Sequence, residues 1–123
     1  MSDIIRISEQ GKRQLIGLKR TTKIQQWNIL CRWALCTSLK DKSPIHTFDL
    51  GPMSNVEMTW ETFCGPHQAC IYALIKNRMN ATPIAQESRN AISLCTTHIH
   101  RGVFMLSHSK PTLPNLMAML PYF

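Results

Sequence analysis

The segment that most constrains the fold is residues 25–40, QQWNILCRWALCTSLK, which we predict to be a helix that is apolar almost all the way round. Such a helix cannot be half-exposed on a small monomer without presenting a large apolar patch. Either the rest of the chain covers it or another copy does, and with 123 residues available we favour a second copy. Arg32, the charged exception within this helix, needs a partner, for which Glu57 and Glu61 are candidates. The predicted oligomer interface consists of Trp27, Leu30, Trp33, Ala34 and Leu35.

The segment before it combines a short strand with a basic helix. Residues 4–8, IIRIS, alternate as a strand requires, with Ile5 and Ile7 on one face. Ser8 is a good N-cap for a helix over residues 9–21, whose basic residues gather beside a narrow apolar stripe. We predict that this basic side binds a polyanion; the alternative is an ordinary solvated helix surface. The predicted DNA-binding residues are Arg6, Lys12, Arg13, Lys19, Arg20 and Lys23.

The charge of the chain supports a polyanionic partner. There are 14 Lys and Arg residues against 7 Asp and Glu, which gives a formal net charge of +7. Residues 1–42 hold nine of the basic residues and three of the acidic ones, an excess that points to nucleic acid or an anionic membrane. No apolar stretch is long enough to span a bilayer, and the first residues lack the pattern of a secretory signal. We therefore expect a cytoplasmic protein that does not bind membranes.

Residues 41–79 are predicted to hold a turn-rich connection, a strand and a helix. The connection covers residues 41–56, and MTWETF at residues 58–63 alternates like an edge strand. Residues 67–79 are expected to be helical, with a stripe at the spacing i, i+3, i+4 and i+7 that begins at Ala69.

A final long helix is predicted to begin at Thr82-Pro83, an N-cap followed by proline at the first helical position, and to end near Leu106. The fold class that follows is mainly α, with a short N-terminal strand and about four helices in a single domain. This domain covers residues 1–108, and an apolar, proline-containing tail covers residues 109–123.

The cysteines and histidines do not form the pattern of a catalytic or metal site. Five scattered cysteines without a CxxC pair are a poor disulfide framework and a weak zinc signal, so we interpret them as buried thiols in a reducing compartment. His98 and His100 would project about 200° apart on a helix and could not share a metal ion. The chain has no GxSxG, HExxH or phosphate-binding glycine loop. We therefore expect neither an enzyme nor a bound metal or cofactor.

Three segments resemble the DndE family of bacterial DNA sulfur-modification (phosphorothioation) proteins. They are IRIS and LIGLKRTT in the first 22 residues, the run N-x-L-C-R-x-A-L-C-x-S-L, and HIHRGV near the C-terminus. The similarity extends over roughly residues 4–106. Its most specific positions are Lys19, Asn28, Cys31 and Arg32, followed by His98, Arg101 and Gly102.

The resemblance implies a helical, ribbon-helix-helix-like subunit that forms a homotetramer. It implies binding to duplex DNA, with a preference for nicked DNA, through surface lysines. It also implies partners, namely a cysteine desulfurase, a sulfurtransferase and an SMC-like ATPase, that carry out the chemistry in which sulfur replaces a phosphate oxygen. This subunit would then be an accessory protein and not the sulfur-transfer enzyme.

Three other hypotheses remain open at the level of sequence. A ribbon-helix-helix transcriptional regulator would read bases with the strand that carries Arg6 and Ser8. A structural scaffold would use the basic helix to dock an acidic protein. A sulfur carrier would use Cys31 or Cys36, although a thiol buried on an apolar helix is a poor nucleophile. Binding measurements against DNA of several sequences separate the first two hypotheses from an accessory DNA-binding role.

Overall fold

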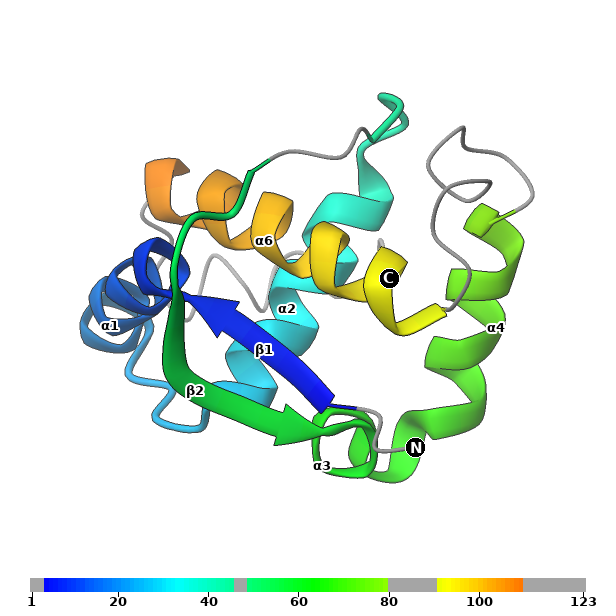
Figure 1. Ribbon diagram of the computed structural model, residues 1–123, viewed down its shortest axis with the longest axis horizontal. Helices are drawn as coiled ribbons and strands as arrows, with labels where there is room; N and C mark the ends of the chain where they lie inside the picture. Colours follow the sequence, from blue (N-terminus) through cyan, green and yellow to red (C-terminus); the bar gives the residue numbers. More distant parts are fainter. Residues whose placement is uncertain (1–3, 46–48, 80–90, 110–123) are drawn as a thin grey trace.

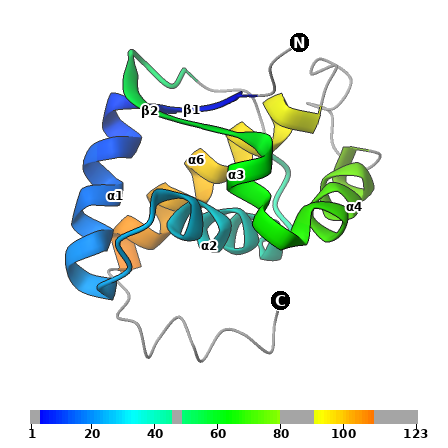
Figure 2. The ribbon, with the colours of Figure 1, turned by 90° about the horizontal axis from the view of Figure 1, so that it is seen from below.

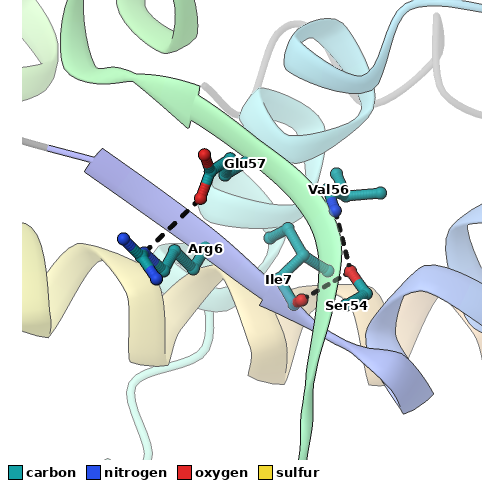
Figure 3. A network of polar contacts seen from close by, with 5 residues as sticks. All are labelled: Arg6, Ile7, Ser54, Val56 and Glu57. Atoms are coloured by element: carbon teal, nitrogen blue, oxygen red, sulfur yellow. Dashed lines mark hydrogen bonds and ion pairs between the residues drawn. The ribbon is translucent and has the colours of Figure 1, made fainter.

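The computed structural model describes residues 4–45, 49–79 and 91–109. Strands β1 (Ile4–Ser8) and β2 (Met53–Thr59) form an antiparallel sheet, in which Arg6 lies opposite Glu57. The register shifts between Arg6 and Ser8, and Ser54 bridges this irregularity (Figure 3). Its hydroxyl donates to the Ile7 carbonyl at 2.7 Å and accepts from the Val56 N–H at 3.0 Å. The predicted strand over residues 4–8 is confirmed.

The remaining elements are helical, so the prediction of a mainly α fold is confirmed. The order β1, α1, α2 is ribbon-helix-helix-like, but the second strand of the ribbon is β2 of the same chain. In both views α1 and α4 stand at opposite ends of the molecule, with α2 and α6 between them (Figures 1 and 2). The helices are α1 (Glu9–Thr22), α2 (Trp27–Lys40), α3 (Trp60–Cys64), the 3-10 helix η1 (Gly65–His67), α4 (Gln68–Met79) and α6 (Ala91–Ser109).

Three of the four long helices match their predicted bounds to within two residues. Helix α1 was predicted over residues 9–21, α2 over residues 25–40 and α4 over residues 67–79. The predicted start of the last helix, at Thr82-Pro83, and nearly all of the predicted tail at residues 109–123 lie outside the described residues. The described part of this helix runs to Ser109, three residues past the predicted end near Leu106, and it buries Cys95, Ile99 and Val103.

The core lies between α2 and α6. The two helices approach each other closely at Gly102, because a Cβ atom there would lie 1.8 Å from the Ala34 carbonyl oxygen. Leu30, Ala34 and Leu35 are buried against this core, with at most 1 % of their surface exposed. The chain itself therefore covers the face of α2 that we expected a second copy to cover. Of the predicted interface residues, only Trp27 and Trp33 keep substantial exposed surface.

A polar network fastens the end of α2 to α6. The Arg101 guanidinium donates from Nε to the Ser38 hydroxyl at 2.8 Å, and from its terminal nitrogens to the carbonyls of Ser38, Asp41 and Ser43. The same hydroxyl lies 2.8 Å from Nδ1 of His98, a fully buried ring. The last carbonyls of a helix lack partners within it. At this end of α2 the Ser38 carbonyl accepts both from the Asp41 N–H and from Arg101.

Two local predictions around β2 were wrong. The strand does not cover residues 58–63, because the Thr59 hydroxyl accepts from the Thr62 N–H and caps a helix that begins at Trp60. Its first residues lie in the segment predicted to be a turn-rich connection, because Ser54 satisfies the irregular backbone there.

The predicted surroundings of two helices also need correction. Helix α4 buries Ile71 and Ile75, whereas the stripe that begins at Ala69 faces outward. Arg32 bonds neither Glu57 nor Glu61, because its guanidinium donates to the carbonyl oxygen of Cys64 at 3.3 Å.

Candidate nucleic-acid interface

Four of the six predicted DNA-binding residues lie on α1, whose two ends are both capped. The Ser8 hydroxyl accepts from the Gly11 N–H at 3.0 Å, as predicted for an N-cap. At the other end the backbone of Lys23 adopts a left-handed conformation, with φ of 66°, and its N–H donates to the Lys19 carbonyl. Leu15 and Leu18 are buried, so the helix presents its remaining side at one end of the molecule (Figures 1 and 2).

The lysines of α1 contact neighbouring elements. Nζ of Lys12 donates to the side-chain oxygen of Asn55 on β2 at 2.7 Å. Nζ of Lys19 lies 3.5 Å from the centre of the Trp27 ring, a cation–π contact with the start of α2. Their charges remain on the surface, but these side chains are partly held in place. Lys23 is exposed at the end of the helix.

The arginines of α1 border an open groove. Arg13 and Arg20 are exposed, and both line a hollow of about 730 Å³ that also includes Ser107 of α6. No carboxylate is among the described residues that line it, so the groove is electropositive. Its other lining residues are Gln10, Gln14, Gly17, Leu18 and Thr21.

The polar residues of this groove were missed by the sequence prediction, although a signal for them exists. Residues 10, 13, 14, 17, 20 and 21 recur at helical spacing and form one stripe of arginine, amide, glycine and hydroxyl groups. Gly17 lies at the middle of this stripe, where an added Cβ would meet no atom within 4 Å. The centre of the groove is therefore free of side chains and can admit a ligand close to the helix backbone.

Arg6 lies apart from α1, on β1. Its Nε is 3.5 Å from a carboxylate oxygen of Glu57 on β2, and both side chains are exposed (Figure 3). An exposed pair of this kind contributes little to stability, but it offsets the positive charge at this position. Of the six predicted DNA-binding residues, Arg6 is the one that forms an ion pair with another described residue.

The cysteines do not gather into a reactive centre. Cys31, Cys64 and Cys95 are buried as predicted, whereas Cys36 is half-buried and Cys70 is exposed. Burial raises the pKa of Cys31 to about 12, and burial followed by the proximity of Cys70 raises the pKa of Cys36. At neutral pH both thiols are therefore protonated, and a thiol is a far weaker nucleophile than a thiolate.

The paired histidines of α6 have separate structural roles. His98 contacts Ser38, and Nε2 of His100 accepts a hydrogen bond from the Ser8 N–H at 3.1 Å. Within the described ranges there is no cluster of three side chains suited to a metal ion. In the same part of the chain no helix has the length and apolar character needed to cross a bilayer.

Comparison with known proteins gives one family. No curated protein matches the chain. The family described as DNA sulphur modification protein DndE matches residues 4–113, which span the whole described structure. The match includes β1, the basic helix α1, the α2–α6 core and the HIHRGV segment. The chain therefore belongs to the DndE family of DNA sulphur modification proteins.

Proposed function

We propose that this protein is a non-catalytic, DNA-binding accessory subunit of DNA phosphorothioation that holds duplex DNA against α1. Membership of the family indicates a role in DNA sulphur modification, together with other proteins of that system. The observation that carries the proposal is the groove beside α1, where Arg13 and Arg20 are exposed and no lining carboxylate opposes them. A helix rise of about 1.5 Å per residue separates these two positions by about 10 Å, the axial rise of about three phosphates on one strand.

The lysines and the sheet complete the proposed interface. Lys12, Lys19 and Lys23 extend the positive charge around α1, and Arg6 adds a weaker, partly neutralised contact. Backbone phosphates are the same for every sequence, so binding should tolerate sequence changes and fall steeply with salt. We expect the protein to bind both intact and nicked duplexes.

The wider assembly belongs to the same proposal. We expect a homotetramer whose contacts include the exposed parts of Trp27 and Trp33, because Leu30, Ala34 and Leu35 are occupied in the core. The sulfurtransferase and the SMC-like ATPase subunits of the modification system are the expected protein partners. No cofactor is required for this binding role.

Two alternatives lose support from specific contacts. A regulator that reads bases with β1 would need Arg6 and Ser8, but Glu57 pairs with the first and the hydroxyl of the second caps α1. A sulfur carrier would need Cys31 or Cys36 as thiolates, and burial opposes that charge at both positions.

The salt dependence of DNA binding tests the proposal. Changing Arg13 and Arg20 together to Ala should weaken binding to duplexes of different sequence by a similar factor. The slope of log K against log salt should fall by about 1.8, or 0.9 for each lost phosphate contact. The matched control changes Lys42 and Lys76 together to Ala. Both lysines are exposed and lie outside α1, and this variant loses as much positive charge as the arginine variant. Equal slopes for the two double variants, or full binding by the arginine variant, would contradict the proposal.

A second pair of variants tests the groove without removing any contact. Gly17→Glu adds a carboxylate where an added side chain has open space, and Gly17→Gln adds a neutral side chain of similar size. The glutamate variant should bind DNA more weakly than the glutamine variant, and both should fold, because both residues are better helix formers than glycine.

A scaffold that docks an acidic protein would instead show no DNA binding by the parent even at low salt.

A further inference from the structure

A second hollow continues the groove along α6. Its volume is about 400 Å³, and it shares Gln10 and Gln14 with the arginine-lined hollow, so the two are contiguous. Ser107 lines the first hollow and Phe104, about one turn earlier on α6, lines the second. The other lining residues are Ser8, Gly11, Asp49, Leu50, His100 and Arg101.

Phe104 is unusual in this polar setting. Its side chain is 50 % exposed, more than any other large apolar side chain in the described ranges. The Phe104 ring is supported by the His108 ring, and the centroids of the two rings lie 4.1 Å apart. An aromatic ring that is held by a neighbour and still half-exposed can accept a second flat ring against it.

The polar groups around Phe104 differ in how far they are already engaged. His100 accepts from Ser8 and contacts the Thr96 carbonyl, and one oxygen of Asp49 accepts from the Gly51 N–H. By contrast, no hydrogen bond joins the side-chain amides of Gln10 or Gln14 to any described residue. A side-chain amide offers a donor and an acceptor side by side, which is the pattern that matches the edge of a nucleobase.

We propose that this second hollow binds one unpaired nucleobase, stacked on Phe104 with its edge toward Gln10 and Gln14. The inference rests on the proposed DNA-binding function, since Arg13 and Arg20 in the adjoining hollow would hold phosphates of the strand that carries this base. The arrangement combines an electropositive track with an aromatic platform, as in proteins that bind single-stranded nucleic acid. It assigns α6 a direct contact with DNA and makes a distorted duplex, with a base out of the stack, the preferred ligand.

A set of three duplexes tests this inference. One is fully paired, one carries a single bulged 2-aminopurine, and one carries an abasic residue at the same bulge. The protein should bind the 2-aminopurine bulge about tenfold more tightly than the abasic bulge, a factor within the range of base–aromatic stacking. Stacking should also quench the 2-aminopurine fluorescence. The abasic duplex controls for backbone flexibility, because it differs only in the missing base.

Variants at Phe104 identify the platform. Phe104→Ala should remove the tenfold preference and the quenching and leave affinity for the fully paired duplex unchanged, whereas Phe104→Tyr should keep both. Half of this side chain is exposed, so the fold should survive, and a thermal unfolding curve checks that. The Arg13→Ala, Arg20→Ala double variant should weaken binding to all three duplexes and preserve their ratio.

The two proposals fail in distinguishable ways. If the parent protein binds the base-bearing and abasic bulges equally, or if Phe104→Ala keeps the preference, the nucleobase site is refuted and phosphate binding by α1 stands. If no duplex is bound at low salt, the proposed function is refuted and the nucleobase site with it.

Discussion

Acid should destabilise this fold mainly through His98, in the pH range from about 6.5 to about 4. The ring is fully buried, with Nδ1 2.8 Å from the Ser38 hydroxyl, and that hydroxyl also accepts from Arg101. Burial, and to a smaller extent the positive charges of Arg101 and Arg78, together lower the pKa of His98 to about 4. Because the Ser38 hydroxyl accepts from Arg101, its own proton is available to donate to Nδ1 of His98. Such a hydrogen bond requires an unprotonated Nδ1 and therefore favours the neutral ring.

The sign and size of the effect follow from the two pKa values. Above pH 6.5 the imidazole is neutral in the folded and unfolded chains, so it adds no pH dependence. As the pH falls from 6.5 to about 4, the unfolded chain takes up a proton that the folded chain does not, and stability decreases. A shift of this size is worth about 3 kcal/mol at roughly 1.4 kcal/mol per pKa unit, a large part of the stability of a small domain.

Two other groups titrate near this range. Burial also lowers the pKa of His100, which adds to the loss in the same direction. The hydrogen bonds from Ser43 lower the pKa of Asp41, and the stability linked to this carboxylate is present above its unfolded value of 3.8 and lost below it. The Asp41 contribution therefore falls outside the pH range assigned to His98.

Urea unfolding at several pH values between 7.5 and 4 measures the effect, with tryptophan fluorescence as the signal. His98→Asn keeps a polar group near Ser38 but cannot titrate. The free energy of unfolding of this variant should be lower than that of the parent at pH 7, and it should fall less steeply toward pH 4. His67→Asn, a change at an exposed histidine, should keep the slope of the parent. An unchanged slope in His98→Asn would refute the assignment of the acid sensitivity to this buried ring.

Three further predictions concern the fold. Gly102→Ala should cost about 3 kcal/mol or prevent folding, because its Cβ would overlap the Ala34 carbonyl and force α2 and α6 apart; circular dichroism and thermal unfolding report this. Ser8→Ala should cost about 1 kcal/mol in urea unfolding through loss of the N-cap bond to Gly11. A thiol reagent should modify Cys70 rapidly in the native protein and should require unfolding to reach Cys31, Cys64 and Cys95.

Local signals in the sequence predicted the elements well, because their causes lie within a few residues. The alternation of Ile5 and Ile7 identified β1, and the hydroxyl of Ser8 identified the start of α1. The failures arose where the cause lies far along the chain. The apolar circumference of α2 indicated burial correctly, but nothing local says that Gly102 allows α6 to approach Ala34 closely enough to provide it.

The same distinction applies to the candidate site. Helical spacing was enough to find the basic side of α1, including the exposed Arg13 and Arg20. It could not show that Lys12 reaches Asn55, 43 positions away, or that Lys19 covers Trp27. It also could not show which part of α6 borders the groove, because Ser107 and Phe104 meet α1 only in the folded chain.

Helix α6 links the stability of the fold to the geometry of the candidate site. Nε2 of His100 accepts from the Ser8 N–H, and the Ser8 hydroxyl in turn caps α1, so α6 fixes the point at which the basic helix begins. The packing there is close, because a Cβ at Gly11 would lie 3.0 Å from Ile7 and 3.4 Å from His100. About one turn beyond His100, α6 places Phe104 in the hollow that continues the arginine-lined groove. The spacing between Phe104 and the arginines is therefore set by buried contacts rather than by surface residues, as the binding site that we propose would require.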